Sequence, residues 1–539
     1  MPPARRPVVL VIRDGWGHNP RADQDFCNAT IQAKTPVNDR LLAEYPHVQI
    51  KTSGTDVGLP PGVMGNSEVG HQNLGAGRIV DQELMRITNA IKDGSFHENP
   101  RLLESIDRAK RTGKTVHLLG LLSDGGVHSH IDHCLALIDV CRKAELPAEQ
   151  LAVHVITDGR DTSPNGGAEY VKTLEEKLKE AGYPPVASVV GRFYAMDRDF
   201  RWDRVQQAYD LLLGRSGEPG ESAGAVLRRY YEKPTDPERA GDEFVAPHFI
   251  QSADGAGPQN GGRIADGDSV VFYNFRGDRP REISKAFVLN DAGWAEIKGG
   301  GFEREPVPSD LYFCTMARYE TGLETEVAFE KPPKMEGILG AAISAAGLTQ
   351  FRCAESEKAP HVTFFFNDYR EEPFVGEEQR EIPSPRDVST YDQKPEMSAR
   401  GVTDAVLNVI ENGEADFILV NYANGDMVGH TGVLEAAISA VDTVDGCVGE
   451  LVDAVLAKGG ALIVTADHGN CEQMVDIDSG RPHTAHTTYD VDCIVVAEDA
   501  KGTVLREGGR LADVAPTALA LLGIEQPAAM TGVSLLSRD

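Results

Sequence analysis

The sequence lacks the usual features of secreted and membrane proteins. Its eight cysteines are scattered between Cys27 and Cys493 without a CxxC pair, which is typical of reduced cytosolic thiols rather than of a disulfide framework. No apolar run approaches the length of a membrane span, and the run at 8–12 is too short for the hydrophobic region of a signal peptide. We therefore expect a soluble, cytoplasmic protein with no membrane partner.

Positive charge is scarce as well. The chain has 53 Lys and Arg against 83 Asp and Glu, a formal net charge of −30. A surface this acidic repels nucleic acid and anionic membranes, so neither is expected as the main partner. Any anionic substrate would need a local cluster of cations.

At 539 residues the chain is too long for one hydrophobic core, so two or more domains are expected. Runs of β-branched and Leu residues alternate with amphipathic segments, which predicts βαβ units and a doubly wound α/β sheet. Helices are predicted at 169–180, 202–213, 398–411 and 434–456, and connections at 82–93 and 319–335. Strands are predicted at 8–12, 116–122, 153–156, 186–190, 270–275, 361–366, 417–420, 461–464 and 493–496.

One serine is placed among glycines, in the stretch Gly65-Asn66-Ser67-Glu68-Val69-Gly70-His71. A serine at a loop-to-helix junction can be exposed where the free N–H groups of the first turn bind an anion, which indicates a nucleophile that attacks phosphorus. The alternative is that Asn66 or Ser67 merely caps a helix.

Acidic and imidazole side chains follow several of the predicted strands. Asp14 follows the first strand, Asp467 and His468 follow the strand at 461–464, and Asp426 stands four residues before His430, so one helical turn would place that pair on one face. Each could instead be a turn residue or a packed histidine. Together with the serine, they favour two divalent ions, Mn²⁺ or Zn²⁺ from the mixed ligand types, that activate the hydroxyl.

The strands of the middle segment end in cations instead. Arginine side chains match carboxylate and phosphate groups bidentately, so this set predicts a small substrate that carries both. Asp161, among these cations, would stay ionised and could act as a base. The alternative is that each arginine pairs with a surface acid. The residues are His128, Arg160, Asp161, Arg192, Arg198, Arg276 and Arg279.

The ordered set of motifs resembles the 2,3-bisphosphoglycerate-independent phosphoglycerate mutase family of the alkaline phosphatase superfamily, nearly end to end. The motifs include Asp14-Gly15-Trp16-Gly17, Met64 to His71, Leu122 to His130, Asp158 to Thr162, Tyr194 to Asp199, Asn274 to Arg279, Thr390-Tyr391-Asp392, Ala466 to Asn470 and Thr484 to Thr488. The resemblance implies an alkaline-phosphatase-like α/β domain, built from 1–84 and 325–539, with a transferase domain at 85–324 inserted into it.

The resemblance also implies roles for single residues. One Mn²⁺ would be held by Asp426, His430 and His486, and a second by Asp14, Ser67, Asp467 and His468. Ser67 would take the phosphoryl group of 3-phosphoglycerate, Lys358 would steady that group, and the seven middle-segment residues would hold glycerate while it reorients to give 2-phosphoglycerate. The expected enzyme is a glycolytic isomerase with two divalent ions, a monomer with a small-molecule substrate.

The sequence departs from the family pattern at Ala359, Asp368-Tyr369 and Tyr489 to Asp492, without loss of a functional side chain. Two rival functions remain. A metal-dependent phosphomonoesterase on the same core would release phosphate and would not need the arginine-rich domain. A catalytically dead metal-binding or scaffolding protein would not need every ligand position to be intact. The two connections are candidate hinges for closing the site against water.

Overall fold

The computed structural model describes residues 5–251 and 257–537. They form two compact units: unit 1 combines the chain up to Gln82 with the chain from Pro332 onward, and unit 2 is Glu83–Lys331. The sequence predicts the two boundaries at 84/85 and 324/325 instead. None of the described helices combines the length and the apolar composition that crossing a membrane requires. Each unit is built on its own sheet.

Within the described residues, unit 1 contains an eight-stranded sheet in the order β12-β11-β13-β1-β14-β15-β2-β16. The strands from β12 to β14 are parallel, whereas β15 runs antiparallel to both of its neighbours, so the sheet is mixed at one side. The bounds are β1 Val8–Arg13, β2 His47–Lys51, β11 Gln350–Glu355, β12 Glu377–Ile382, β13 Phe417–Tyr422, β14 Ala461–Thr465, β15 Val491–Val496 and β16 Gly509–Arg510.

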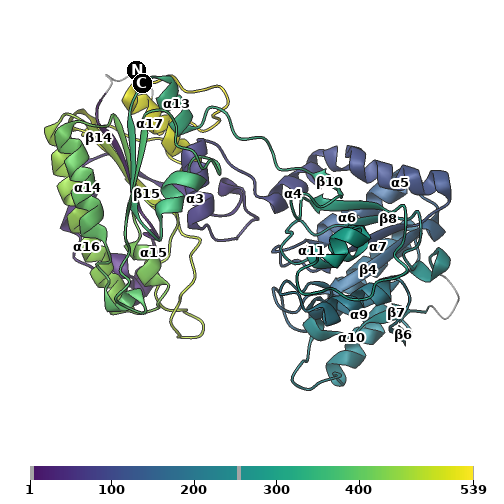
Figure 1. The fold of residues 1–539 in the computed structure, drawn as a ribbon. Coiled ribbons are helices and arrows are strands. Elements are labelled where there is room, and N and C mark those ends of the chain that lie inside the picture. The colour runs from purple at the N-terminus through teal and green to yellow at the C-terminus, as the bar shows by residue number, and fades with distance from the viewer. Residues whose placement is uncertain (1–4, 252–256, 538–539) are drawn as a thin grey trace. The chain divides into compact units, whose positions relative to one another are not determined.

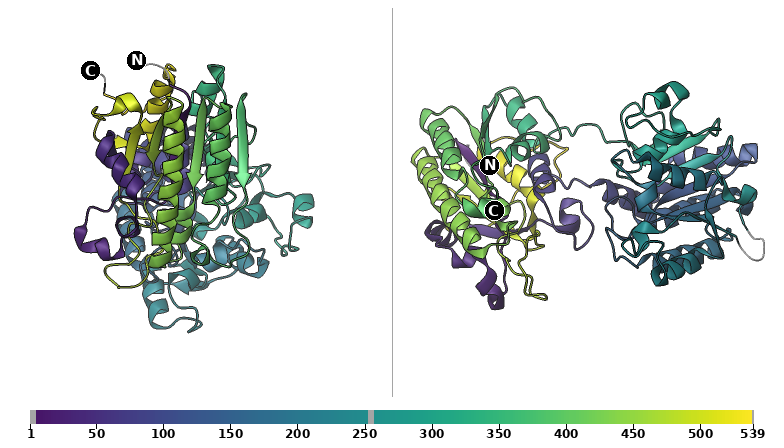
Figure 2. Two further views of the ribbon diagram at one scale, coloured as in Figure 1. Left: turned by 90° about the vertical axis from the view of Figure 1, so that its left-hand side faces the viewer. Right: turned by 60° about the horizontal axis from the view of Figure 1, so that its bottom comes forward.

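Helices cover both faces of this sheet. Figure 1 shows α14 and α16 along one face and α3, α13 and α17 on the other, and Figure 2 (left) looks onto the face that α14 and α16 cover. The bounds are α1 Ala29–Gln32, α2 Pro36–Glu44, α3 Ser67–Ala76, α13 Leu339–Ala345, α14 Ala399–Asn412, α15 Asn424–Gly429, α16 Leu434–Ala457 and α17 Val514–Leu522. The layers are therefore helix, sheet and helix, as in a doubly wound fold.

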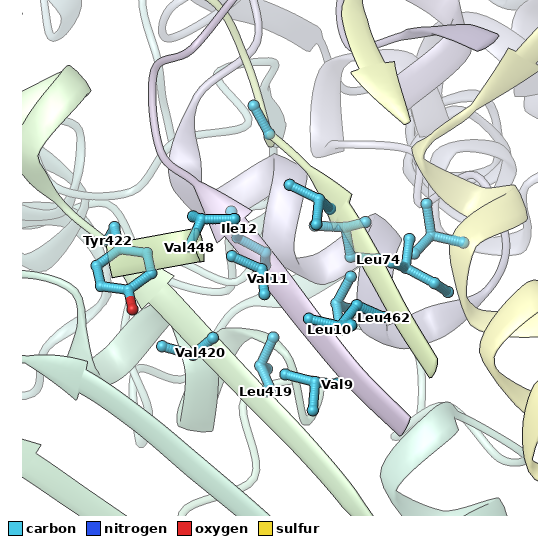
Figure 3. Close-up of a cluster of buried hydrophobic side chains, with 14 of the residues drawn as sticks. Val9, Leu10, Val11, Ile12, Leu74, Leu419, Val420, Tyr422, Val448 and Leu462 are labelled. Carbon is cyan, nitrogen blue, oxygen red and sulfur yellow. The ribbon is translucent and has the colours of Figure 1, made fainter. Parts of the chain in front are cut away.

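Strand β1 lies at the centre of the unit 1 core. Every residue of Val8–Arg13 is buried, because β13 and β14 flank the strand and helices cover its two faces. Figure 3 shows Val9 and Val11 with Leu419, Val420 and other apolar side chains around them. Burial on both faces explains why this segment reads as a continuous apolar run and not as an alternating one.

Unit 2 contains a second eight-stranded sheet among its described residues, in the order β10-β9-β8-β3-β4-β5-β7-β6. All neighbours are parallel except β5 and β7. The bounds are β3 Val116–Leu122, β4 Leu151–Thr157, β5 Ser188–Gly191, β6 Glu218–Gly220, β7 His248–Ile250, β8 Ser269–Phe272, β9 Tyr312–Ala317 and β10 Glu326–Phe329.

This second sheet separates two apolar cores. Along β3, Leu118 packs into one core and Leu119 into the other, as expected when successive side chains point to opposite faces. Helices α5, α6, α7 and α10 line the first core, and α9 and α11 line the second. The bounds are α4 Glu83–Asp93, α5 Pro100–Thr112, α6 Ile131–Lys143, α7 Gly167–Ala181, α8 Arg192–Ala195, α9 Trp202–Leu212, α10 Ala223–Glu232, α11 Arg281–Val288 and α12 Asp291–Ala295.

Three predictions from the sequence are wrong in detail. The predicted strand at 361–366 is a π-helical turn, His361–Phe365, in which Val362 and Phe366 are buried four residues apart, the spacing of a helix and not of a strand. The predicted connection at 82–93 is helix α4, which buries Leu84 and Ile87. The other predicted connection, at 319–335, contains strand β10.

Candidate functional site

Ser67 is the first residue of helix α3. The helix begins there because Asn66 has an extended backbone and its side chain accepts a hydrogen bond from the N–H of Val69. Asn66 is thus the cap, which leaves the hydroxyl of Ser67 for other partners. Its Oγ lies 2.6 Å from Lys358 Nζ, 3.0 Å from His468 Nε2 and 3.2 Å from Asp14 Oδ1.

The metal ligands expected from the sequence gather around this hydroxyl at the carboxyl ends of three adjacent parallel strands. Asp14 follows β1, Asp467 and His468 follow β14, and Asp426 lies on the short helix α15 that follows β13. His468 Nε2 lies 3.5 Å from Asp14 Oδ1 and 4.0 Å from Asp426 Oδ1, so it faces both carboxylates. All seven predicted ligands therefore belong to one cluster within unit 1.

Three histidine rings direct their Nε2 atoms into the cluster, while their Nδ1 atoms face backbone carbonyl oxygens. The Nδ1 atoms of His430, His468 and His486 lie 2.7, 3.3 and 2.9 Å from the carbonyl oxygens of Thr484, Gly469 and Gly65. Because a carbonyl oxygen can only accept, each Nδ1 carries the hydrogen, and the lone pair of the neutral ring is on Nε2. Backbone carbonyls that orient a ring in this way are a common support for metal-bound histidine.

The atoms that face one another in the cluster would repel without a cation. Nε2 of His430 lies 3.1 Å from Nε2 of His486, and both lie within 3.1 Å of Asp426 Oδ1. Burial, then the nearby charge of Asp467, raises the pKa of Asp14. A divalent ion would satisfy these lone pairs and carboxylates together, so the residues fit such ions.

Lys358 is the cation of this cluster. It lies in the turn after β11, and its Nζ donates to Asp14 Oδ1 at 2.9 Å and to Asp426 Oδ2 at 2.6 Å, besides Ser67. Burial disfavours the charged amine, but the carboxylates of Asp14 and Asp426 outweigh burial and raise the pKa of Lys358. The amine is therefore positively charged beside the serine hydroxyl.

In unit 2 the predicted substrate residues form a second cluster. Arg192 is buried, and its NH1 group donates to Asp158 Oδ1 at 2.6 Å and to Asp161 Oδ2 at 2.5 Å. Asp278 accepts from Arg198 at 3.3 Å, and its carboxylate also lies 3.2 Å from Arg276 and 3.5 Å from His128. Burial, followed by the charge of Arg192, lowers the pKa of His128 to about 4. His128 is thus a neutral ring among guanidinium groups at pH 7.

This cluster opens onto a cavity of about 400 Å³ within unit 2. Arg160, Arg192, Arg198 and Arg279 line it, and so do Arg201 and Arg204, which are not among the predicted substrate residues. Arg160 and Arg201 pair with carboxylates at its edge, whereas Arg279 donates to the carbonyl of Met196 at 3.1 Å. The cavity therefore suits a small anion.

Comparison with known proteins identifies the family. A family model described as the metalloenzyme superfamily matches residues 6–526. A curated protein of Rhodopirellula baltica named 2,3-bisphosphoglycerate-independent phosphoglycerate mutase is 59% identical, over 99% of this chain and 97% of its own. The chain belongs to the 2,3-bisphosphoglycerate-independent phosphoglycerate mutase family.

Further members of this family agree. A Synechocystis protein of the same name is 48% identical over 99% of this chain and 96% of its own. The solved structure of Leishmania mexicana phosphoglycerate mutase at low cobalt concentration has a TM-score of 0.60 and 32% identity, and covers 100% of this chain and 99% of that one. The family assignment confirms the predicted fold class and the predicted isomerase class.

Two residues that the sequence reasoning did not single out support the predicted ligands of this family member. His71 lies on α3 with Nδ1 2.8 Å from the carbonyl of Ser67 and 3.2 Å from Asp467 Oδ2. The amide of Asn421 donates to Asp14 Oδ2 at 2.8 Å and lies 3.0 Å from His71 Nε2. Both ring nitrogens of His71 thus have hydrogen-bonding partners, and His71 orients Asp467 while Asn421 orients Asp14.

Glu472 is the third such residue, and it joins the loops that carry the ligands. Its carboxylate accepts from the N–H of Gly17 at 3.0 Å, from the N–H of Asn470 at 2.8 Å and from the hydroxyl of Thr487. These three residues follow Asp14, His468 and His486, and a Cβ atom on Gly17 or Gly469 would overlap the carboxylate. No local motif could reveal the contact with Gly17, which lies 455 residues before Glu472 in the sequence.

Proposed function

We propose that this chain interconverts 3-phosphoglycerate and 2-phosphoglycerate without bisphosphoglycerate, through a phosphoserine at Ser67. The hydroxyl of Ser67 attacks phosphorus, the bond from phosphorus to the glycerate oxygen breaks, and that oxygen takes up a proton. Glycerate then accepts the phosphoryl group on its other hydroxyl, which loses a proton, and Ser67 regains its own. The reaction belongs to glycolysis and gluconeogenesis.

The single observation that carries this proposal is the convergence on Ser67 Oγ. The hydroxyl is within 3.2 Å of a lysine amine, an imidazole lone pair and a carboxylate, all of them buried. Serine is a poor nucleophile until its alkoxide is stabilised. A capping or structural serine would not need three ionisable partners around its oxygen.

We propose two divalent ions at this site, with Mn²⁺ as the favoured ion because the donor set mixes carboxylate and imidazole. Asp426, His430 and His486 would hold one, and Asp14, Ser67, Asp467 and His468 the other. When bound, such ions lower the pKa of the hydroxyl and neutralise phosphoryl oxygens. Lys358 adds a fixed positive charge for the same phosphoryl group.

The arginine-lined cavity supports a role in holding the glycerate part of the substrate. Arg160, Arg192, Arg198, Arg276 and Arg279 would bind its carboxylate and hydroxyl oxygens, with neutral His128 as a further hydrogen-bonding group. Asp161 lies 2.5 Å from Arg192, and it would receive and return the hydroxyl proton.

A coupled assay tests the proposal. Enzyme purified with EDTA and then supplied with Mn²⁺ is given 3-phosphoglycerate without bisphosphoglycerate, and both 2-phosphoglycerate and inorganic phosphate are measured. We expect 2-phosphoglycerate to form only with metal and to exceed phosphate strongly. Phosphate as the main product would favour the phosphomonoesterase, and no turnover with any divalent ion would favour the scaffolding protein.

We also infer a monomer in the cytoplasm. All eight cysteines are buried and unpaired, which suits a reducing compartment. Size-exclusion chromatography with light scattering tests the monomer, and a mass of twice the chain would contradict it. Cell fractionation tests the compartment.

A further inference from the structure

Two consecutive residues without the freedom of glycine adopt a left-handed backbone. Asp368 has φ +55° and Tyr369 has φ +57°, immediately after the π-helical turn. Residues with a Cβ atom disfavour this region, and it persists only where the surroundings hold it. The contacts of this pair, the Asp368–Tyr369 turn, therefore show what holds it in place.

The first set of contacts comes from the chain segment that enters unit 1 from unit 2. Lys334 Nζ donates to the carbonyl oxygens of Asp368 at 2.9 Å and Tyr369 at 2.7 Å, and the amine also lies over the Tyr369 ring. The N–H of Met335 donates to Asp368 Oδ2 at 2.6 Å. The turn thus fastens this segment two residues after it enters unit 1 at Pro332.

The second set comes from helix α3. Tyr369 donates its hydroxyl hydrogen to Glu68 Oε1 at 3.0 Å, and the amide of Gln72 donates to Asp368 Oδ1 at 3.4 Å. Glu68 and Gln72 are four residues apart and share one face of the helix. Glu68 directly follows Ser67.

The segment that leaves unit 1 for unit 2 reaches the same helix face. The side-chain amide of Gln82, the last residue of unit 1 there, donates to Gln72 Oε1 at 3.3 Å. Its N–H donates to the carbonyl of Gly58 at 2.9 Å. Gln72 thus binds the outgoing segment with its oxygen and the Asp368–Tyr369 turn with its nitrogen.

We propose that Asp368 and Tyr369 are positioning residues that fasten both connecting segments to the helix of the nucleophile. They act on the reaction through Glu68 and Gln72, which fix the first turn of α3 and with it Ser67. The inference rests on the proposed function. The role of the strained turn is to hold Ser67 in position, so that the phosphoryl group stays on Ser67 until glycerate accepts it.

Two variants test this role. Tyr369→Phe keeps the ring but removes the hydroxyl, and with it the hydrogen bond to Glu68. The pair Asp368→Gly with Tyr369→Gly relieves the backbone strain while it removes the side-chain contacts. We expect kcat to fall about threefold in the first and about tenfold in the second, the sizes that follow from losing one or both of the hydrogen bonds to α3. KM for 3-phosphoglycerate should stay within about twofold, because the proposed glycerate residues are untouched.

Two further readouts distinguish positioning from a structural role. Phosphate released per 2-phosphoglycerate formed should rise in both variants, and the melting temperature of Tyr369→Phe should not fall, since the ring keeps its contacts with Phe364 and Phe365. The double variant Tyr369→Phe with Glu68→Gln should lose no more kcat than Tyr369→Phe alone if the hydroxyl acts through Glu68.

Matched controls are available in unit 2. Tyr312→Phe removes a tyrosine hydroxyl that donates to the carbonyl of Arg101 at 3.0 Å, and Glu145→Gly relieves an exposed left-handed residue with φ +54°. Neither should change kcat or the phosphate ratio. Unchanged kcat and ratio in Tyr369→Phe and the glycine pair, or a loss in Tyr369→Phe that follows a lower melting temperature, would overturn the inference. Absence of mutase turnover in the unaltered chain would instead overturn the proposed function.

Discussion

The two units place their functional side chains at the same position relative to the sheet, but these side chains carry opposite charge. In each, parallel strands end at one edge of a mixed sheet, and the loops beyond those ends carry the chemistry. In unit 1 the loops bring together Asp14, Asp426 and Asp467 with a single lysine, Lys358. In unit 2 they bring together arginines, and six arginines line the cavity proposed to hold substrate.

The difference shows which ligand each edge can accept. A cluster of carboxylates and imidazole lone pairs is stable only with cations, whereas a cluster of guanidinium groups recruits an anion. In a chain with net charge −30, the second cluster is the exceptional one, since the overall field repels an anionic substrate. We therefore propose that unit 1 binds the metal and the phosphoryl group and that unit 2 binds the acid part of the substrate.

The largest expected effect follows from removing the nucleophile of unit 1. Ser67→Ala should lower kcat by about 10³-fold or more, because no other hydroxyl takes its place between Lys358 and His468. Bound metal should remain, as six of the seven proposed ligands are kept. Steady-state kinetics with metal analysis checks both, and mutase activity close to that of the unaltered chain would remove Ser67 from the mechanism.

A smaller effect is expected on the unit 2 side. Arg276→Ala should lower kcat/KM by about 10- to 100-fold, since one charge-assisted contact to substrate is lost, without any change in metal content. Arg318→Ala is the control, because Arg318 forms an exposed pair with Glu330 in the same unit. If the two variants behaved alike, Arg276 would not belong to the substrate site.

The contacts of Glu472 with the ligand-bearing loops of unit 1 give a prediction for metal affinity. Glu472→Gln keeps the size of the side chain but replaces one acceptor oxygen by a donor that faces N–H groups, so metal affinity should fall by about 10- to 100-fold. Excess metal should restore activity. Calorimetric titration of the metal-free protein measures the affinity, and Glu377→Gln, another carboxylate that accepts hydrogen bonds in unit 1, should leave it unchanged.

The smallest effect concerns the acid stability of unit 2. Burial lowers the pKa of His133 in α6 to about 3, whereas an unfolded chain binds this proton near pH 6.5. Below pH 6.5 the unfolded state therefore binds more protons, and between pH 7 and pH 5 folding loses about 2 kcal/mol from this residue. His133→Gln should reduce that loss.

Amide hydrogen exchange of α6 at pH 7 and pH 5, corrected for intrinsic rates, measures the effect in this unit directly. The unaltered chain should lose more protection at pH 5 than His133→Gln does. An equal loss in both proteins would show that His133 takes up its proton in the folded state, contrary to its burial.

The sequence predicts those parts of the fold that local pattern determines. Strands β1, β13 and β14 are buried on both faces and therefore read as apolar runs, and Asp426 and His430 are one helical turn apart in sequence. The segment at 361–366 misleads because its apolar residues suit a strand, while its burial follows a helical period set by contact with α3.

The sequence does contain a pattern that indicates helix α4. Leu84 and Ile87, with Ile91 four residues further, follow the spacing of one helix face, which outweighs the polar character of the segment. The sequence holds no such signal for Glu472 and the Asp368–Tyr369 turn, because Glu472 contacts Gly17 and Tyr369 contacts Glu68, each hundreds of residues away. Such contacts become visible only when the chain is folded.

The most direct test of the account is whether phosphate is found on Ser67 during turnover. Enzyme with Mn²⁺ is mixed with 3-phosphoglycerate, quenched in acid within milliseconds and digested for mass spectrometry, with Ser67→Ala treated alongside. The account predicts a phosphorylated peptide whose modified residue is Ser67, formed as fast as 2-phosphoglycerate and absent without metal. Turnover with no phosphorylated Ser67, or with the phosphoryl group on another residue, would contradict it.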